Sequence, residues 1–284
     1  MSRSSETPPS AVSYAKRRAP SAVSAAERRP PSAVSYAEWR PPGDLASHAC
    51  CVWAHAAGPS GHVHRVLPDG CADIVWMGRG RLVVAGPATA HVYADIAAGE
   101  TAVGVRFGPG AAGAALGLPA RELRDRNVDL VEIWGAQGGE LAERLADAPP
   151  ASRLALLAGA VAQRLREASP PDALVARAAR HLGAGVPVAD TGREVALGER
   201  HLRRRFHDAV GYGPKTLQRV LRLHRFLRLA EDGAEPDLAR AAAEAGYFDQ
   251  PHLSRECREF TGLSPGALLA ARGPRSERVG VATS

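Results

Sequence analysis

The sequence predicts an α+β protein in which a small β-rich N-terminal domain with flanking helices precedes an all-α domain of two helix-turn-helix motifs joined by a long helix. Short runs separated by Gly and Pro fill the first half, whereas apolar residues recur every three or four positions in the second. A chain of 284 residues with 45% hydrophobic residues can bury more than one core. We therefore expect an arm at 1–43, a β-rich domain at 44–168, a helical domain at 169–273 and a disordered tail at 274–284.

The predicted arm is a tandem repeat with a period of 11 residues, PSAVSYAKRRA, PSAVSAAERRP and PSAVSYAEWRP, beginning at Pro9, Pro20 and Pro31. A proline at the head of each unit would interrupt a continuous helix. We interpret the segment as a duplication that forms a disordered basic arm. The alternative is that its basic residues add nonspecific phosphate contacts to a nucleic acid and steepen the salt dependence of binding. These residues are Lys16, Arg17, Arg18, Arg28 and Arg29.

The first half contains four short segments with the composition of β-strands, separated by turns that contain Gly or Pro. The predicted strands are His64–Leu67, Asp73–Met77, Arg81–Ala85 and Thr101–Phe107. This arrangement predicts a small β-rich domain, for which a cupin-like barrel is one architecture.

Histidines are the main candidates for a metal site in this half. His62 and His64 stand at i and i+2, so their imidazoles would project from one face of a strand, with His48 and His55 upstream. No carboxylate or third histidine stands at a matching offset, and alternate histidines on an exposed strand need no ligand. We therefore expect neither a metal nor a cofactor.

The cysteines and tryptophans of this half allow a functional and a packing interpretation. Cys71, in a turn, is a candidate reactive thiol, and the vicinal pair Cys50 and Cys51 a candidate redox sensor. Apolar packing is the commoner role. The tryptophans are candidates for an effector pocket, but we expect them in the core. They are Trp53, Trp76 and Trp134.

Composition limits the partners and the compartment. The net charge of +6 favours a polyanionic partner, although Lys16 and Lys215 are the only lysines and the bias towards Arg and Ala also fits a GC-rich genome. Whether the chain binds a nucleic acid must therefore be judged from the placement of arginines on helix faces. The four cysteines show no zinc-ligand spacing, and the most apolar run, Leu154–Ala162, is shorter than the ~20 residues of a membrane span. We expect a cytoplasmic protein without a membrane partner.

Helical spacing begins at Gln137 and continues to Glu167, with a break at Pro149–Pro150. These helices are expected to pack on the β-rich domain or to pair subunits. The double proline in Ser169–Pro171 marks the domain boundary, since it cannot continue a helix.

The first half of the helical domain contains a lead helix over Asp172–Leu182 and then two helices, Val188–Val195 and Glu199–Asp208. On the last of these, arginines face one side and apolar residues the other. A helix over Pro214–Glu231 follows. It carries apolar residues on more than one side and spans about 27 Å at a rise of 1.5 Å per residue, which suits a rigid spacer between two motifs.

The stretch from Pro236 to Pro265 has the clearest pattern in the chain. Apolar residues at i, i+3, i+4 and i+7 predict a short helix over Asp237–Ala245, which ends at Gly246. Asp249 is a good N-cap for the next helix, and Pro251 would lie in its first turn. Its packed side is predicted to contain Leu253, Cys257 and Phe260. Its free side is predicted to contain Pro251, Ser254, Arg255 and Arg258.

This stretch resembles the second helix-turn-helix of AraC/XylS-type transcription regulators, in GYFDQPHLSR at 246–255 followed by FTGLSP at 260–265. Three further segments look like an N-terminal domain that commonly precedes AraC-type DNA-binding domains. They are LPDGCADIVW at 67–76, AGPATA at 85–90 and the segment 103–135. The resemblance implies a regulatory half followed by a DNA-binding half.

The resemblance also implies which residues approach DNA. The residues expected to contact bases are Arg200, Arg203 and Arg204 in the first motif, and Gln250, His252 and Arg255 in the second. The residues expected to contact phosphates are Arg205, Arg219, Arg222 and Arg258. The first motif departs from the family pattern at Thr191, Gly192, Ala196 and Gly198, so we expect it to be the more mobile one.

We therefore expect a sequence-specific bacterial transcription regulator without catalytic residues. Its partner would be double-stranded operator DNA, with RNA polymerase and a small-molecule effector of the N-terminal domain as further candidates. Two helices on one spacer can reach successive major grooves, about 34 Å apart, without a second subunit. The alternative is a DNA-repair or metal-dependent enzyme that uses an AraC-like module for targeting. Such an enzyme needs a nucleophilic cysteine or a metal in the N-terminal domain. A third interpretation is a DNA-binding protein without an effector.

Overall fold

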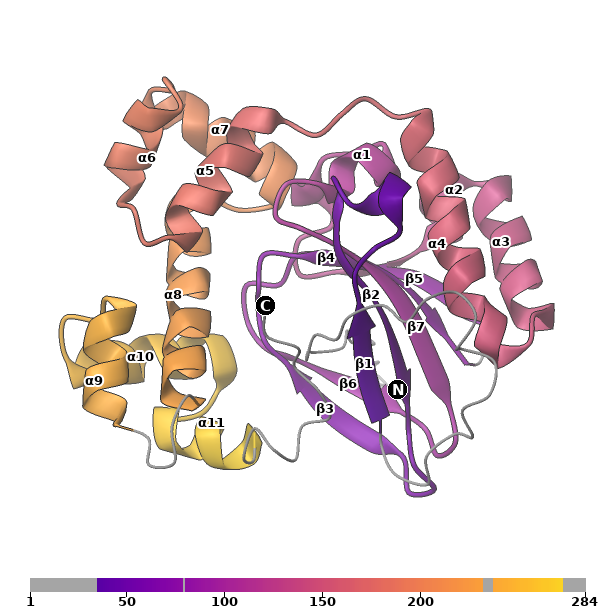
Figure 1. Cartoon of the computed structure of the whole chain (residues 1–284), viewed down its shortest axis with the longest axis horizontal. Helices are drawn as coiled ribbons and strands as arrows, with labels where there is room; N and C mark the ends of the chain where they lie inside the picture. The colour runs from indigo at the N-terminus through magenta and orange to yellow at the C-terminus, as the bar shows by residue number, and fades with distance from the viewer. Residues whose placement is uncertain (1–34, 79, 232–236, 273–284) are drawn as a thin grey trace, which may run out of the picture.

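The computed structural model describes residues 35–78, 80–231 and 237–272, and the rest of the predicted arm and tail lies outside these ranges. Within them, a β-rich half is followed by a helical half (Figure 1). A six-stranded antiparallel sheet has the order β1-β2-β7-β4-β5-β8, and β3 pairs separately with β6. The strands are β1 Ser35–Trp39, β2 Ala49–Ala56, β3 His62–Val66, β4 Ala72–Met77, β5 Arg81–Ala85, β6 Val92–Ile96, β7 Thr101–Phe107 and β8 Asn127–Asp129.

Both faces of the large sheet are buried, which explains why most residues of its central strands are apolar. Ile74 and Trp76 of β4 lie in a core on the face covered by helices, whereas Val75 lies in a second core towards β3 and β6. Successive side chains of a strand point to opposite faces, so both cores draw on the same strands. Figure 1 shows α2, α3 and α4 beside the large sheet. The helices of this half are α1 Ala112–Leu116, α2 Leu130–Trp134, α3 Ala136–Asp147 and α4 Pro150–Arg166, with short 3-10 helices η1 Gly43–Leu45 and η2 Ala120–Glu122.

The first strand corrects the predicted arm, which was expected to extend to residue 43. Ser35–Trp39 pairs with β2 across the whole length of β1, and it comes from the third copy of the repeat. The buried carboxylate of Glu38 accepts a hydrogen bond from Arg106 of β7 at 3.0 Å. The first copy has Lys16 at the corresponding place and cannot make this ion pair. Tertiary pairing therefore orders a segment whose repeat pattern predicted disorder.

Arg106 joins three strands from inside the domain. Besides Glu38 of β1, its guanidinium contacts Asp73 of β4 at 3.1 Å and Asp69 at 4.0 Å. Burial raises the pKa of Asp73 well above its ordinary range and lowers the pKa of Arg106. Trp53 of β2 donates to the same Asp73 carboxylate at 2.7 Å. The cluster cross-links β1, β2, β4 and β7, and removing one member would leave a buried charge without its partner.

The helical half is built on α8, as its apolar residues on several sides predicted. Leu217 of α8 lies in the core formed with α5, α6 and α7, whereas Leu223 and Phe226 lie in the core formed with α9, α10 and α11. Figure 1 shows the two groups of helices at opposite ends of α8. The helices are α5 Ala173–Gly183, α6 Val188–Glu194, α7 Glu199–Val210, α8 Pro214–Glu231, α9 Leu238–Ala245, α10 Gln250–Thr261 and α11 Pro265–Arg272.

Candidate nucleic-acid interface

The second motif, α9 with α10, has capped ends and a packed apolar side. Asp249 caps α10 by accepting a hydrogen bond from the backbone N–H of His252 at 2.7 Å. The helix ends at Gly262, which adopts the left-handed conformation that glycine tolerates best. The residues predicted to pack, Leu253, Cys257 and Phe260, are buried. The prediction of the packed side of α10 is therefore confirmed.

The opposite side of α10 presents charged and polar side chains to solvent. Gln250, Arg255 and Arg258 are exposed, and none of their side chains makes a hydrogen bond or ion pair with the residues that the structure describes. Donors that no protein group occupies remain available to an external acceptor. This side of α10 is therefore chemically suited to bind an anion or a base edge.

A buried carboxylate that the sequence pattern did not reveal fixes α10 to α8. Glu256 is 2% exposed and accepts hydrogen bonds from Arg222 at 2.6 Å and Arg219 at 2.8 Å, and from the Tyr247 hydroxyl at 2.9 Å. Burial alone would raise the pKa of Glu256, but the hydrogen bonds from the two arginines outweigh it and lower the pKa. Position 256 lies on the packed side of α10, which was the available signal that it is buried. Its partners on α8 could not be read from the sequence.

This network changes the role predicted for Arg219 and Arg222, which were expected to contact phosphates. Arg219 also donates to Glu259 at 3.0 Å and lies 4.9 Å from the centre of the Phe260 ring. Arg222 lies 4.8 Å from the centre of the Tyr247 ring. The geometry does not support phosphate contact, because both guanidinium groups are occupied by buried or neighbouring carboxylates.

His252, predicted to contact a base, is half-buried at the edge of this network. Its Nδ1 accepts from the backbone N–H of Phe248 at 3.5 Å, its Nε2 lies 3.2 Å from a guanidinium nitrogen of Arg222, and its ring packs against Tyr247 at 5.2 Å between centroids. These contacts hold the imidazole in one orientation, with part of its edge left to solvent.

The first motif, α6 with α7, shows the predicted two-sided helix. Leu202 and Phe206 of α7 are buried, whereas Arg200, Arg203 and Arg204 are exposed and make no hydrogen bond or ion pair with any described side chain. The remaining predicted contact, Arg205, pairs with Asp172, the N-cap of α5. Three free arginines thus lie in the first two turns of α7.

The two recognition helices can be aligned by their caps. Each begins after its N-cap and ends at a left-handed glycine, so positions correspond at a constant offset of 51 residues, the difference between the N-cap numbers 249 and 198. In this alignment the buried leucines correspond, and so do two exposed arginines. The corresponding pairs are Gly198 with Asp249, Leu202 with Leu253, Arg204 with Arg255 and Gly211 with Gly262.

The N-terminal half packs on the carboxyl ends of both recognition helices. Arg121 forms an ion pair with Asp208 near the end of α7. At the end of α10, the N–H of His91 donates to the carbonyl of Phe260 at 2.8 Å, and Arg65 donates to the carbonyl of Thr261. The amino ends, which carry the predicted base contacts, point away from these attachments.

A loop of the N-terminal half also packs into the helical half between these attachments. Leu67 is buried in the core around α8 and α10, and the Nε2 of His224 on α8 donates to the carbonyl of Pro68 at 2.6 Å. A Cβ on Gly70 would lie 2.6 Å from Leu217, so glycine permits this close approach. The two halves therefore share part of one core.

The candidate metal ligands in the N-terminal half lie close together without forming a site. The rings of His55, His62 and His64 neighbour each other, with centroids 5.8 Å and 5.6 Å apart. Burial lowers the pKa of His55 and of His64 to about 4, so both are neutral at pH 7. Among the described residues, no group of three or more His, Cys, Asp or Glu side chains is placed to hold a metal.

The cysteines and tryptophans lie where packing places them. A hydrogen bond with Cys50, and then burial, raises the pKa of Cys71 well above its ordinary range, so the protonated thiol predominates. Cys50 is exposed and Cys51 is buried, and none of the four cysteines forms a disulfide. The three tryptophans expected in the core, Trp53, Trp76 and Trp134, are buried.

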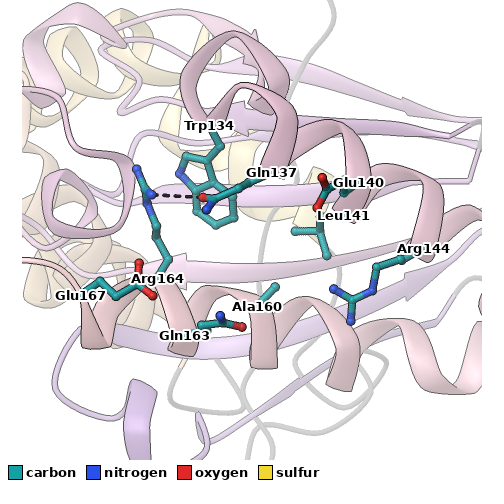
Figure 2. A pocket seen from close by; sticks show the side chains of 9 residues that line it. All are labelled: Trp134, Gln137, Glu140, Leu141, Arg144, Ala160, Gln163, Arg164 and Glu167. Carbon is teal, nitrogen blue, oxygen red and sulfur yellow. Dashed lines mark hydrogen bonds between the residues drawn. The ribbon is translucent and has the colours of Figure 1, made fainter.

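A cavity of about 200 Å³ opens between α3 and α4 (Figure 2). Arg164 lies 5.6 Å from the centre of the Trp134 ring and donates to Gln137 at 3.2 Å, and Arg144 lies across the cavity on α3. Glu140 and Glu167 balance the two arginines. The lining is mixed in charge and selects no class of ligand.

No helix among the described ranges is long and apolar enough to cross a membrane.

Two protein-family models match the chain, one in the β-rich half and one in the helical half. Residues 37–129 match a domain of unknown function, DUF6597, and residues 192–271 match a helix-turn-helix domain. No curated protein matches the chain. Solved structures of ToxT align with most of the chain at a TM-score of 0.42: ToxT from Vibrio cholerae O395 is 9% identical over 77% of this chain and 95% of that one, and a second V. cholerae ToxT structure is 11% identical over 74% and 97%. Residues 192–271, which run from α6 to α11, therefore form a helix-turn-helix domain.

Proposed function

We propose that the protein regulates transcription by inserting α7 and α10 into successive major grooves of one duplex. The observation that carries the proposal is the pair of recognition helices fixed to one spacer, with arginines near their amino ends that no protein group occupies. In helix-turn-helix proteins the amino-terminal residues of the recognition helix contact base edges. The 18 residues of α8 span about 27 Å, which is compatible with the ~34 Å repeat of DNA.

The geometry supports a division of roles among the arginines. Arg204 and Arg255 occupy equivalent exposed positions and are proposed to contact bases, since a guanidinium fits the O6 and N7 acceptors of guanine. Arg200, Arg203, Gln250 and His252 are proposed to lie along the same groove edges. Arg258 is proposed to contact phosphates, and so is Arg205, which is more exposed than Arg219 or Arg222 because 41% of its side chain remains accessible beside its ion pair with Asp172. Arg219 and Arg222 are reassigned to orient α10 through Glu256.

We further propose that residues 44–168, extended to include β1, form a regulatory or assembly domain, and that 169–273 form the DNA-binding domain. The attachments of the N-terminal half to the ends of α7 and α10 support this division of labour. A small-molecule effector or RNA polymerase would act through this half. The proposal assigns no catalytic residue.

The test is selection of bound duplexes from a random pool with the full-length protein. The proposal predicts two sequence blocks with centres about 10 bp apart. Arg204→Ala and Arg255→Ala should each relax one position, in different blocks, at a cost of about 1–3 kcal/mol in discrimination. Arg258→Ala should instead weaken all sequences alike and reduce the salt slope by about one. A single block, or equal effects of all three variants on every sequence, would contradict the proposal.

A further inference from the structure

One large apolar side chain of the second motif is almost fully exposed. Phe248 is 92% exposed, the highest value among the exposed large hydrophobic residues, and it belongs to none of the apolar clusters. The adjacent Tyr247 is buried and bonded to Glu256. Single apolar side chains are often exposed on protein surfaces, but a ring exposed at this place offers apolar area whose burial by a partner would be favourable.

Comparison of the two motifs shows that the fold does not need a residue at this place. At the end of α6 the N–H of Leu197 bonds to the carbonyl five residues earlier, and at the end of α9 the N–H of Tyr247 does the same. The next residue after Leu197 is the N-cap Gly198, whereas Phe248 stands between Tyr247 and the N-cap Asp249. Phe248 is therefore an extra residue in the turn of the second motif.

The position of Phe248 suits contact with a base. It immediately precedes the N-cap of α10, and its backbone N–H donates to the Nδ1 of His252 at 3.5 Å, which ties this part of the turn to the first turn of the helix. Gln250, in that first turn, is exposed beside it. The ring thus projects from the end of α10 that carries the proposed base contacts.

We propose that Phe248 is a specificity-determining residue that packs against the C5-methyl group of a thymine in the second operator block. The inference rests on the proposed function, since it requires α10 in a major groove. The thymine methyl is the apolar group that base pairs present in the major groove, and phenylalanine is among the side chains that contact it. The guanidinium and amide groups nearby would read hydrogen-bonding edges, and the ring would read the methyl group that they cannot recognise.

The experiment removes the methyl group and the ring separately. Each thymine of the second block in the selected operator is replaced by deoxyuridine, which lacks the C5-methyl group and keeps every hydrogen-bonding atom. Binding of the full-length protein is measured by fluorescence anisotropy for the wild type, Phe248→Ala and Phe248→Leu. At one thymine we expect the wild type to lose about three- to tenfold in affinity, on the scale of burying one methyl group and its surroundings.

Phe248→Ala should bind the thymine operator about three- to tenfold more weakly than the wild type and should not respond to deoxyuridine at that position, as coupled partners in a double-mutant cycle do. Phe248→Leu should restore part of the response. Val131→Ala is the matched control, because Val131 is an exposed apolar residue on α2 of the other half and should leave affinity unchanged. Thermal unfolding should be unchanged in Phe248→Ala, since the ring has few contacts to lose.

An undiminished deoxyuridine response in Phe248→Ala, unchanged affinity of this variant, or a second block without thymine would overturn the inference. A uniform loss on every operator would also overturn it, because it would assign the ring to the sugar-phosphate backbone or to another protein. Arg255→Ala on the same duplexes separates the two proposals. If it still relaxes a guanine position, the proposed function stands whatever Phe248 does; if the wild type shows no sequence preference, the proposed function itself fails.

Discussion

The two helix-turn-helix motifs have the same backbone plan but are stabilised in different ways. In the second motif both helices have aspartate N-caps, Asp237 and Asp249, and the turn glycine Gly246 has a φ of 90°. In the first motif neither N-cap residue has a capping side chain, and the corresponding turn residue is Ala196, with a φ of 53°. The backbone plan thus persists when the side chains that favour it are replaced.

The attachment of each recognition helix to the spacer also differs. Glu256 on α10 is bonded to two arginines of α8, whereas the corresponding position of α7 is Arg205, whose partner Asp172 is the part-exposed N-cap of α5. Buried, hydrogen-bonded ion pairs fix orientation more strongly than exposed ones. Buried polar side chains thus hold α10 to α8 in addition to apolar packing, whereas α7 is held mainly by apolar packing. We therefore keep the expectation that the first motif is the more mobile one.

The largest expected effect comes from removing an arginine of the buried network. Arg222→Leu should destabilise α10 by roughly 2–4 kcal/mol, because Glu256 would keep its charge with one guanidinium fewer. Hydrogen exchange of α10 amides, followed by mass spectrometry, measures the change as a lower free energy of local opening. Arg205→Leu is the matched variant in the first motif and should cost less than about 1 kcal/mol, as exposed pairs do. Equal effects would remove the distinction between the motifs.

A pH series should show the same difference without a mutation. The pKa of Glu256 is lowered in the folded protein, so its contribution to stability is complete above the ordinary glutamate pKa of about 4.3 and is lost as the pH falls through the lowered value. Protection of α10 amides, corrected for intrinsic exchange, should therefore decrease more steeply than that of α7 below about pH 4.5. In Glu256→Gln, the protection of α10 amides should decrease with falling pH no more steeply than that of α7. An identical slope in this variant would assign the acid sensitivity to another group.

Exchanging the turn residues should move the stability of the two motifs in opposite directions. Gly246→Ala should cost about 1–2 kcal/mol, because alanine is strained at positive φ although its Cβ would meet open space. Ala196→Gly relieves the same strain but increases the conformational entropy of the unfolded chain, which opposes folding. We therefore expect a net gain in stability of about 0.5–1 kcal/mol. Hydrogen exchange of the flanking helices is the readout. Destabilisation by Ala196→Gly would show that the positive φ of Ala196 does not strain the backbone of the first motif.

A buried hydroxyl distinguishes the first helices of the motifs. Thr191 is 0% exposed and its hydroxyl has no hydrogen-bond partner among the described residues. The corresponding residue of α9 is Ala241, because α6 and α9 align at an offset of 50 residues, one fewer than the recognition helices that follow the extra Phe248. Thr191→Val keeps the shape and removes the unpaired group, so we expect a gain of about 1 kcal/mol in the opening free energy of α6. Ala241→Thr should cost a similar amount. A loss on Thr191→Val would mean that the hydroxyl has a partner, such as water.

The smallest expected effect concerns the N-caps of the recognition helices. Gly198→Asp should stabilise α7 by a few tenths of a kcal/mol, and Asp249→Gly should destabilise α10 by a similar amount, since glycine caps moderately well. Exchange of the first-turn amides resolves changes of this size. An effect above about 1 kcal/mol would show that the caps contribute more to the difference between the motifs than Glu256 and its arginines do.

Much of the helical half could be predicted from the chain alone. The predicted bounds of α8 agree with the structure, and the predicted packed and free sides of α7 and α10 are confirmed. Gly192 was expected to weaken α6, but a Cβ there would lie 3.0 Å from the carbonyl of Leu197, so the glycine also permits the turn to approach the helix. Helical periodicity reports which side of a helix is buried, but not how closely the next segment passes.

The β-rich half was harder to predict. The bounds of β5 and β7 agree with the structure, whereas β1, β2, β6 and β8 were missed. The sequence of β2, ACCVWAHA, has few β-branched residues, and its burial on both sides gives no clear alternation. A short strand owes its stability to pairing with distant residues, so local sequence carries little information about it.

The two motifs, the spacer between them and the sides of α7 and α10 that carry free arginines could be predicted from the sequence, because they depend on contacts within a few residues along the chain. The pairing of Glu256 with Arg219 and Arg222, the entry of Leu67 into the core around α8 and the position of Phe248 outside every core became visible only in the folded protein. Each of these depends on which distant residue comes near, and that is set by the packing of whole elements against one another.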